Sequence, residues 1–210
     1  MRLIDTHSHL FLEEFSEDLP QVIERARSAG ITHIFMPNID STTIDSMLSV
    51  CNTYNDYCFP MIGLHPTSVN ADYEKELEIV ARELKSFNKY IAIGEVGMDL
   101  YWDKTFLKEQ QIVLDKQINW ALEYDLPVVI HCRDAFGYIY NVLEPYKNTS
   151  LKGVFHSFTG TDDEAARILE FSGFLIGING VVTFKKSRLP EVLTKISLEK
   201  IVLETDSPYL

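Results

Sequence analysis

The chain has 210 residues, 46% of them hydrophobic and 24% charged, a balance typical of a soluble globular protein with one domain. This composition excludes a disordered chain, and the longest apolar runs, such as residues 126–130, are far shorter than the roughly 18 residues of a membrane span. A net charge of −12 argues against a broad basic face for duplex DNA, so any contact with a polyanion must be local or assisted by bound cations.

The cysteines and the N-terminus indicate the cellular compartment. Three cysteines without a CxxC pair disfavour a disulfide scaffold and a cysteine-only zinc site. Residues 1–5 lack the apolar region of a secretory signal. We therefore expect a cytoplasmic protein with no membrane partner.

Eight short runs rich in Ile, Val and Phe are predicted to be buried parallel strands. They are residues 3–7, 32–36, 59–63, 90–95, 128–131, 152–156, 174–178 and 200–204. The amphipathic stretches between them predict helices, among them residues 20–30, 104–124 and 161–169. Strict alternation favours a (β/α)8 TIM barrel over an open doubly wound sheet, with residues 1–210 as its single domain. Because the sequence stops just past the eighth strand, the barrel is expected to lack its final C-terminal helix.

Polar side chains recur where the predicted strands end. These are His7 and His9 at the first strand, His65 at the third, Glu95 at the fourth, His131 at the fifth, His156 at the sixth and Asp206 after the eighth. In a barrel, all of them lie at the C-terminal mouth, where active sites of this architecture are found. A single HxH pair is equally typical of ordinary buried histidines, but this many polar groups converging in an apolar barrel need ions to compensate them.

Imidazole and carboxylate ligands without thiolate suit zinc, manganese, iron or magnesium. Glu95 is the best candidate to bridge two ions, since each of its oxygens can bind one, and two ions can clamp both oxygens of a displaced phosphoryl group. Cys132 follows His131 directly, so strand alternation places it on the other face as a packing residue. Glu204 shares its strand parity with Asp206, and we expect it to lie beneath that residue and support it.

Six motifs run in order along the chain: residues 5–9 (DTHSH), 63–66 (GLHP), 93–99 (IGEVGMD), 130–135 (IHCRDA), 155–160 (FHSFTG) and 203–210 (LETDSPYL). With these motifs the chain resembles the TatD-related metal-dependent deoxyribonucleases, within the amidohydrolase-like barrel enzymes. The resemblance implies a hydrolase with two divalent ions, which could be Mg, Mn or Zn. It implies one ion on His7, His9, Glu95 and Asp206, and a second on Glu95, His131 and His156. Asp206 would also orient or deprotonate the attacking water.

Further residues at the mouth are candidate substrate contacts. Given the resemblance, His65 would donate to the scissile phosphate, the alternative being a turn histidine. Arg133 could bind a phosphate in a bidentate manner, or form an ion pair with a neighbouring acid. Tyr101 and Trp102 could stack on unpaired bases or pack as a lid. Ser157 is a candidate phosphate or ribose contact.

The sequence therefore predicts a metal-dependent deoxyribonuclease, a phosphodiesterase that hydrolyses DNA from single-stranded ends as an exonuclease. One alternative is a small-molecule amide, ester or phosphoester hydrolase of the amidohydrolase type, since a barrel does not fix its substrate. Glu95 weakens that alternative, because related amidohydrolases often place a modified lysine there. Another alternative is a metal-binding remnant without turnover, against which all six ligand positions hold competent residues.

The absent final helix also predicts an exposed apolar strip. Alternation directs Ile4, Ile201 and Leu203 toward the outer layer, where an eighth helix would cover them. We expect the chain to associate with itself through this strip, where strand eight meets strand one, or to depend on metal for its stability.

Overall fold

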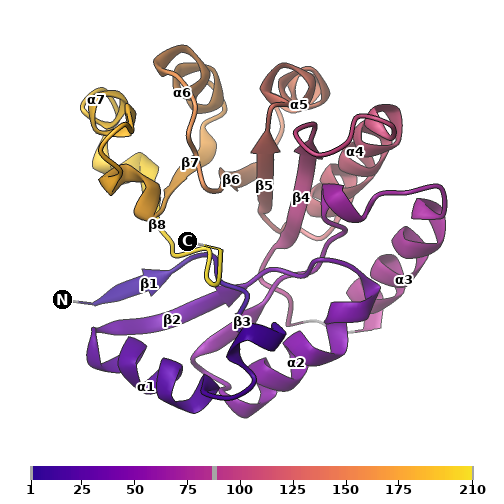
Figure 1. Cartoon of the computed structure of the whole chain (residues 1–210). Coiled ribbons are helices and arrows are strands. Elements are labelled where there is room, and N and C mark those ends of the chain that lie inside the picture. The colour runs from indigo at the N-terminus through magenta and orange to yellow at the C-terminus, as the bar shows by residue number, and fades with distance from the viewer. Residues whose placement is uncertain (1, 87–88, 210) are drawn as a thin grey trace.

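The structure is a computed structural model that describes residues 2–86 and 89–209, so Leu210 of the last motif lies outside the described residues. Its strands are β1 Leu3–Asp5, β2 Ile31–Met36, β3 Cys58–Pro60, β4 Ile93–Asp99, β5 Val128–Arg133, β6 Lys152–Phe155, β7 Gly173–Ile178 and β8 Ile201–Leu203 (Figure 1). Its α-helices are α1 Leu19–Ser28, α2 Ile44–Thr53, α3 Tyr73–Ser86, α4 Leu107–Glu123, α5 Phe136–Leu143, α6 Asp162–Leu169 and α7 Leu189–Leu193. Single 3-10 turns lie at Glu13–Phe15, Ser41–Thr43, Pro66–Ser68, Glu144–Tyr146, Gly180–Thr183 and Leu198–Lys200.

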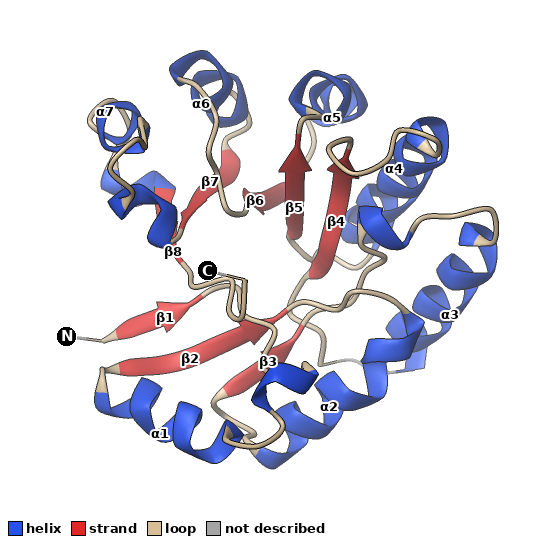
Figure 2. Cartoon of the chain, viewed as in Figure 1, coloured by secondary structure: helices blue, strands red, loops and turns tan. Residues whose placement is uncertain are grey.

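The strands form two parallel sheets, in the orders β1-β2-β3 and β4-β5-β6-β7-β8. Isolated parallel bridges join the sheets at two seams, Ile62 to Ile93 between β3 and β4, and Ser8 to Ser207 beyond β1 and β8. The helices lie outside the strands (Figure 2). The predicted TIM-barrel architecture is thus confirmed, with a hydrogen-bonded ladder that is interrupted at both seams.

Every predicted strand is present, but β4 begins three residues later and ends four residues later than expected. The register pairs Gly97 with His131 and Asp99 with Arg133, so β4 continues along β5 past Glu95. Gly97 permits this close pairing, since its φ is +136° and a Cβ there would lie 2.0 Å from the carbonyl oxygen of His131. The extension carries Asp99 into the mouth of the barrel.

The helix boundaries follow local capping chemistry. At α6 the Thr161 hydroxyl accepts the backbone N–H of Glu164, and the Glu164 carboxylate accepts the backbone N–H of Thr161, which completes the predicted capping box. The stretch predicted as a helix over 104–124 is helical from Leu107 to Glu123. None of the described helices is long and apolar enough to cross a bilayer.

The expected apolar strip is partly present. Ile4 and Leu203 are 43% and 53% exposed, whereas Ile201 is half-buried and packs against the core. Self-association through this strip stays a prediction, which light scattering tests.

Candidate metal centre

Glu95 lies at the centre of the side chains that meet at the barrel mouth, and it is buried. Its Oε2 lies 3.1 Å from Nε2 of His7 and 3.5 Å from Nε2 of His9. Its Oε1 lies 3.0 Å from Nδ1 of His131 and 3.0 Å from Nε2 of His156. The two carboxylate oxygens therefore face different imidazoles, an arrangement that suits a ligand shared by two ions.

Asp206 and His65 complete the cluster from opposite sides. Oδ1 of Asp206 lies 3.7 Å from Nε2 of both His7 and His9, and the backbone of Asp206 is in the left-handed region with φ +60°. Nε2 of His65 lies 3.4 Å from Oε1 of Glu95. The ligand atoms that lie within 4.8 Å of one another form three groups: His7, His9 and Glu95; His7, His156 and Asp206; His65, Glu95 and His131.

The charges of the cluster fit a bound cation. Nε2 of His7 and Nε2 of His9 lie 3.2 Å apart, and the rings of His7 and His156 stack with centroids 3.6 Å apart. Burial and the neighbouring His156 lower the pKa of His7, so its ring presents a lone pair rather than a charge. Burial alone would raise the pKa of Glu95, but the imidazoles of His156, His65 and His7 hold it well below its usual range. A carboxylate ringed by imidazole nitrogens is a donor set that divalent metals favour.

Asp99 is a member of the site that the sequence analysis did not single out. Its buried carboxylate Oδ2 lies 2.9 Å from Nε2 of His131, the nitrogen that faces away from Glu95. Gln110 holds the Asp99 backbone, with its Oε1 accepting the N–H at 2.9 Å. Burial would lower the pKa of His131, but Asp99 and Glu95 together raise it. Asp99 thereby fixes which nitrogen His131 turns to the centre.

Glu204 supports His156 rather than Asp206, contrary to expectation. Its Oε1 accepts a short hydrogen bond from the backbone N–H of Ser157 and lies 3.4 Å from Nδ1 of His156. The close fit requires Gly177, because a Cβ there would lie 2.5 Å from Oε2 of Glu204. Alternate residues of an extended strand point to the same side, but Glu204 and Asp206 do not, because the backbone of Asp206 leaves the extended conformation. Burial opposes the charge on His156, but Glu95 and Glu204 raise the pKa of His156 well above its usual value.

The candidate substrate contacts divide into two groups. Arg133 stacks on Tyr101, with its guanidinium carbon 3.9 Å from that ring centroid and 5.3 Å from that of Trp102. Tyr101 and Trp102 are 54% and 71% exposed, and within residues 2–86 and 89–209 Arg133 forms no ion pair. Arg133 and Trp102 line a pocket of about 350 Å³ together with the centre. Ser157 lies apart from this pocket, and its hydroxyl accepts a hydrogen bond from Asn179.

Comparisons with known proteins place this geometry in a family. A family model described as TatD related DNase matches residues 4–210. The chain belongs to this family. It is 35% identical to the uncharacterized metal-dependent hydrolase YabD of Bacillus subtilis, over 99% of this chain and 81% of that protein. It is 31% identical to a protein of Pantoea ananatis named 3'-5' ssDNA/RNA exonuclease TatD, over 99% of this chain and 80% of that one.

A solved structure agrees with the sequence comparison. The crystal structure of YjjV, a TatD homolog from Escherichia coli, matches with a TM-score of 0.91 and 32% identity, over 99% of this chain and 80% of that chain. The chain thus belongs to a family of metal-dependent hydrolases, as the motifs predicted.

Proposed function

We propose that this TatD-family protein is a two-metal phosphodiesterase that shortens DNA from a single-stranded end. The proposal rests on Glu95, whose two oxygens face separate imidazole pairs at 3.0–3.5 Å. A cytoplasmic location stays a prediction, consistent with cysteines that are all free.

The proposed ligands follow the two sides of Glu95. His7, His9 and Asp206 lie on the Oε2 side and would hold the first ion, while His131 and His156 lie on the Oε1 side and would hold the second. When bound, the ions supply a Lewis acid that neutralises phosphate charge and acidifies water. The nitrogen and oxygen donors suit Mg, Mn or Zn, whose identity metal analysis determines.

Asp206 is the proposed general base. Its side chain is 15% exposed, so it lies at the edge of the centre that solvent reaches. Burial would raise its pKa, but a hydrogen bond from His9 and the nearby His156 and His7 lower it. Asp206 therefore remains a carboxylate at neutral pH and can take a proton from the attacking water.

His65 is proposed to donate to the scissile phosphate rather than to bind metal. Its Nδ1 accepts the backbone N–H of Thr67 at 3.2 Å, so the hydrogen of the neutral ring is on Nε2, which faces Glu95. Burial lowers the pKa of His65 and keeps the ring neutral. A protonated Nε2 is a hydrogen-bond donor and cannot coordinate an ion.

The exposed rim supports an unpaired strand as substrate. Tyr101 and Trp102 offer faces on which a base can stack, and Arg133, which has no carboxylate partner among the described residues, can bind a phosphate with two N–H groups. The name of the Pantoea relative, an exonuclease on ssDNA and RNA, agrees with this substrate class.

Metal analysis followed by digestion of end-labelled strands with each divalent ion tests the proposal. We expect about two ions per chain, stepwise shortening of single-stranded DNA, and a shallow salt dependence with a log–log slope of about −1 to −3. Cleavage of duplex interiors as fast as of single-stranded ends would contradict the proposed substrate. Hydrolysis of small esters alone would favour the small-molecule alternative.

A further inference from the structure

A short basic segment, Phe184–Arg188, follows β7 at the same end of the barrel as the metal centre. It contains Lys185, Lys186 and Arg188 and no acid, although the whole chain carries 31 acidic against 19 basic residues. All three cations are exposed, and the Phe184 ring is 57% exposed beside them. Cations alternating with an exposed aromatic ring are the chemistry that binds an unpaired nucleic acid strand.

The cations of the basic segment are available to a ligand. Within the described ranges, Lys185 and Lys186 have no carboxylate within 4 Å, and Arg188 has only Glu191, 3.8 Å away on the same exposed surface. An exposed pair at that distance contributes little and yields readily to a phosphate. Some other lysines already have a carboxylate partner, as Lys152 has in Asp125 at 2.9 Å.

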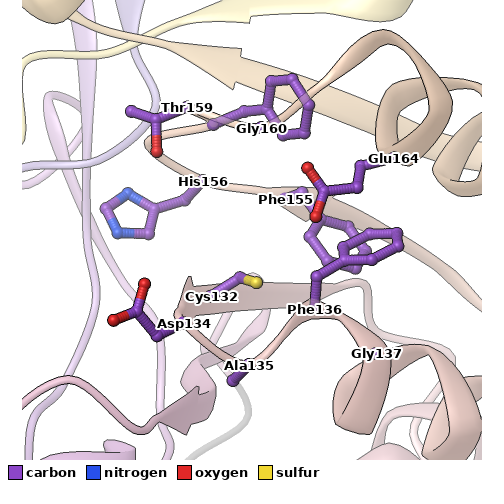
Figure 3. Close-up of a pocket in the computed structure, with 11 residues that line it drawn as sticks. Cys132, Asp134, Ala135, Phe136, Gly137, Phe155, His156, Thr159, Gly160 and Glu164 are labelled. Carbon is purple, nitrogen blue, oxygen red and sulfur yellow. The ribbon is translucent and has the colours of Figure 1, made fainter.

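Three adjoining pockets connect the basic segment with the metal centre. The pocket at the centre, of about 350 Å³, shares His156 with a middle pocket of about 390 Å³ (Figure 3). The middle pocket shares Thr159 and Gly160 with an outer pocket of about 570 Å³, which Lys186 and Arg188 line. The shared residues show that the three pockets are neighbours, in sequence from the metal centre to the basic segment.

The acids of the middle pocket determine where the phosphates of a bound strand can lie. Asp134, after β5, and Glu164, on α6, both direct their carboxylates toward the pocket (Figure 3). A phosphate in the middle pocket would be repelled by both, whereas an uncharged base would not. The outer pocket is lined by as many cations (Lys186, Arg188 and Lys195) as acids (Asp162, Asp163 and Glu191), so a phosphate beside Lys186 and Arg188 meets less repulsion there than in the middle pocket.

We propose that the basic segment binds the body of the single strand whose end lies at the metal centre, with phosphates on Lys186 and Arg188 and a base in the middle pocket. This inference rests on the proposed nuclease function and adds a second contact region, beyond the nucleotides at the scissile bond. A dinucleotide has a single phosphodiester, which would lie at the metal centre, so only longer strands offer a second phosphate to the basic segment.

The test compares the double variant Lys186→Ala/Arg188→Ala with a charge-matched control, Arg82→Ala/Lys116→Ala, whose exposed side chains lie on α3 and α4. We measure kcat/KM of the metal-loaded enzymes at several salt concentrations, on a dinucleotide and on a strand of about 15 nucleotides, which exceeds most single-strand site sizes. For the longer strand, the Lys186/Arg188 variant should lose about 2- to 30-fold at low salt. Its log–log salt slope should become shallower by about 1.4, which is 0.7 for each of two phosphates.

Turnover of the dinucleotide should stay at the wild-type value in both variants, and the control should match wild type on both substrates. An unchanged salt slope on the longer strand, or an equal loss on both substrates, would overturn the inference while leaving the nuclease function in place. A wild-type enzyme that cuts neither substrate would instead refute the proposed function, and the inference with it.

Discussion

Replacing Glu95 by glutamine alters one atom at the centre of the site and tests its bridging role. If the amide nitrogen replaces Oε1, it faces Nδ1 of His131 and Nε2 of His156 at 3.0 Å; if it replaces Oε2, it faces Nε2 of His7 at 3.1 Å. In either orientation one side loses its shared anionic oxygen. We expect the metal content to fall from about two ions per chain to at most one, because the neutral amide no longer joins two sites.

The same change should destabilise the metal-free protein in a defined pH window. The depressed pKa of Glu95 gives stability that is present above its unfolded pKa, about 4.5, and lost as pH falls through the folded value. The raised pKa of His156 gives stability that is fully present below its unfolded pKa, about 6.5, and lost as pH rises through the folded value. Between these two pH limits both Glu95 and His156 are charged. Removing the Glu95 charge from this buried pair should lower the free energy of unfolding by about 3–5 kcal/mol.

Two measurements decide the outcome for Glu95→Gln. Metal analysis after dialysis gives the number of bound ions, and urea unfolding at about pH 6 in chelator gives the loss of stability. Asp206→Asn is the comparison variant: it also removes one proposed carboxylate ligand but none of the Glu95 contacts, so it should lose less metal and less stability than Glu95→Gln. A Glu95→Gln protein that keeps both ions and unfolds at the wild-type urea concentration would refute the bridging role.

Four further variants test single positions. Asp206→Asn should lower kcat by at least ~10²–10⁴ with a smaller loss of metal, and near wild-type turnover would contradict its role as base. Asp99→Ala should weaken metal affinity about 10- to 100-fold and shift the imidazole ¹⁵N resonances of His131, which equilibrium dialysis and NMR measure. Gly97→Ala would place a Cβ 2.0 Å from a backbone oxygen, and it should lower the free energy of unfolding, measured in urea, by more than about 4 kcal/mol. Gly137→Ala in α5, where a Cβ would have nothing within 4 Å, should raise the free energy of unfolding by about 0.5–1 kcal/mol. Similar changes in stability for the two glycine variants would contradict the β4–β5 packing.

The sequence predicted the strands and the histidines at their ends because each strand is a short apolar run that stops at a polar residue. Glu95 and His131 could be assigned to the same end of the barrel from this pattern alone. Asp99 also had a signal in the sequence, since Glu95, Gly97 and Asp99 alternate along one strand and share a face. The prediction missed it because it ended that strand at Glu95.

Other properties of the site depend on geometry that the sequence does not encode locally. The left-handed backbone of Asp206 breaks the alternation on which the expected position of Glu204 depended. The hydrogen position on His65 follows from the backbone N–H of Thr67, which only the folded turn brings to Nδ1. Such details require coordinates because a single dihedral angle or hydrogen bond reverses the role of a side chain.

The two seams of the barrel give the proposed ions a mechanical role. His7 and His9 follow the three-stranded sheet, whereas Glu95 belongs to the five-stranded sheet, so the ligand set crosses both seams. Backbone hydrogen bonds cross the seams, among them Gly94 N–H to Ile62 and His9 N–H to Ser207, but within the described residues they form only isolated bridges and no continuous ladder. The proposed ions would therefore join the two half-barrels. Their removal should open the seams first, so that the amide hydrogens of Gly94 and His9 exchange with solvent sooner than those inside either sheet.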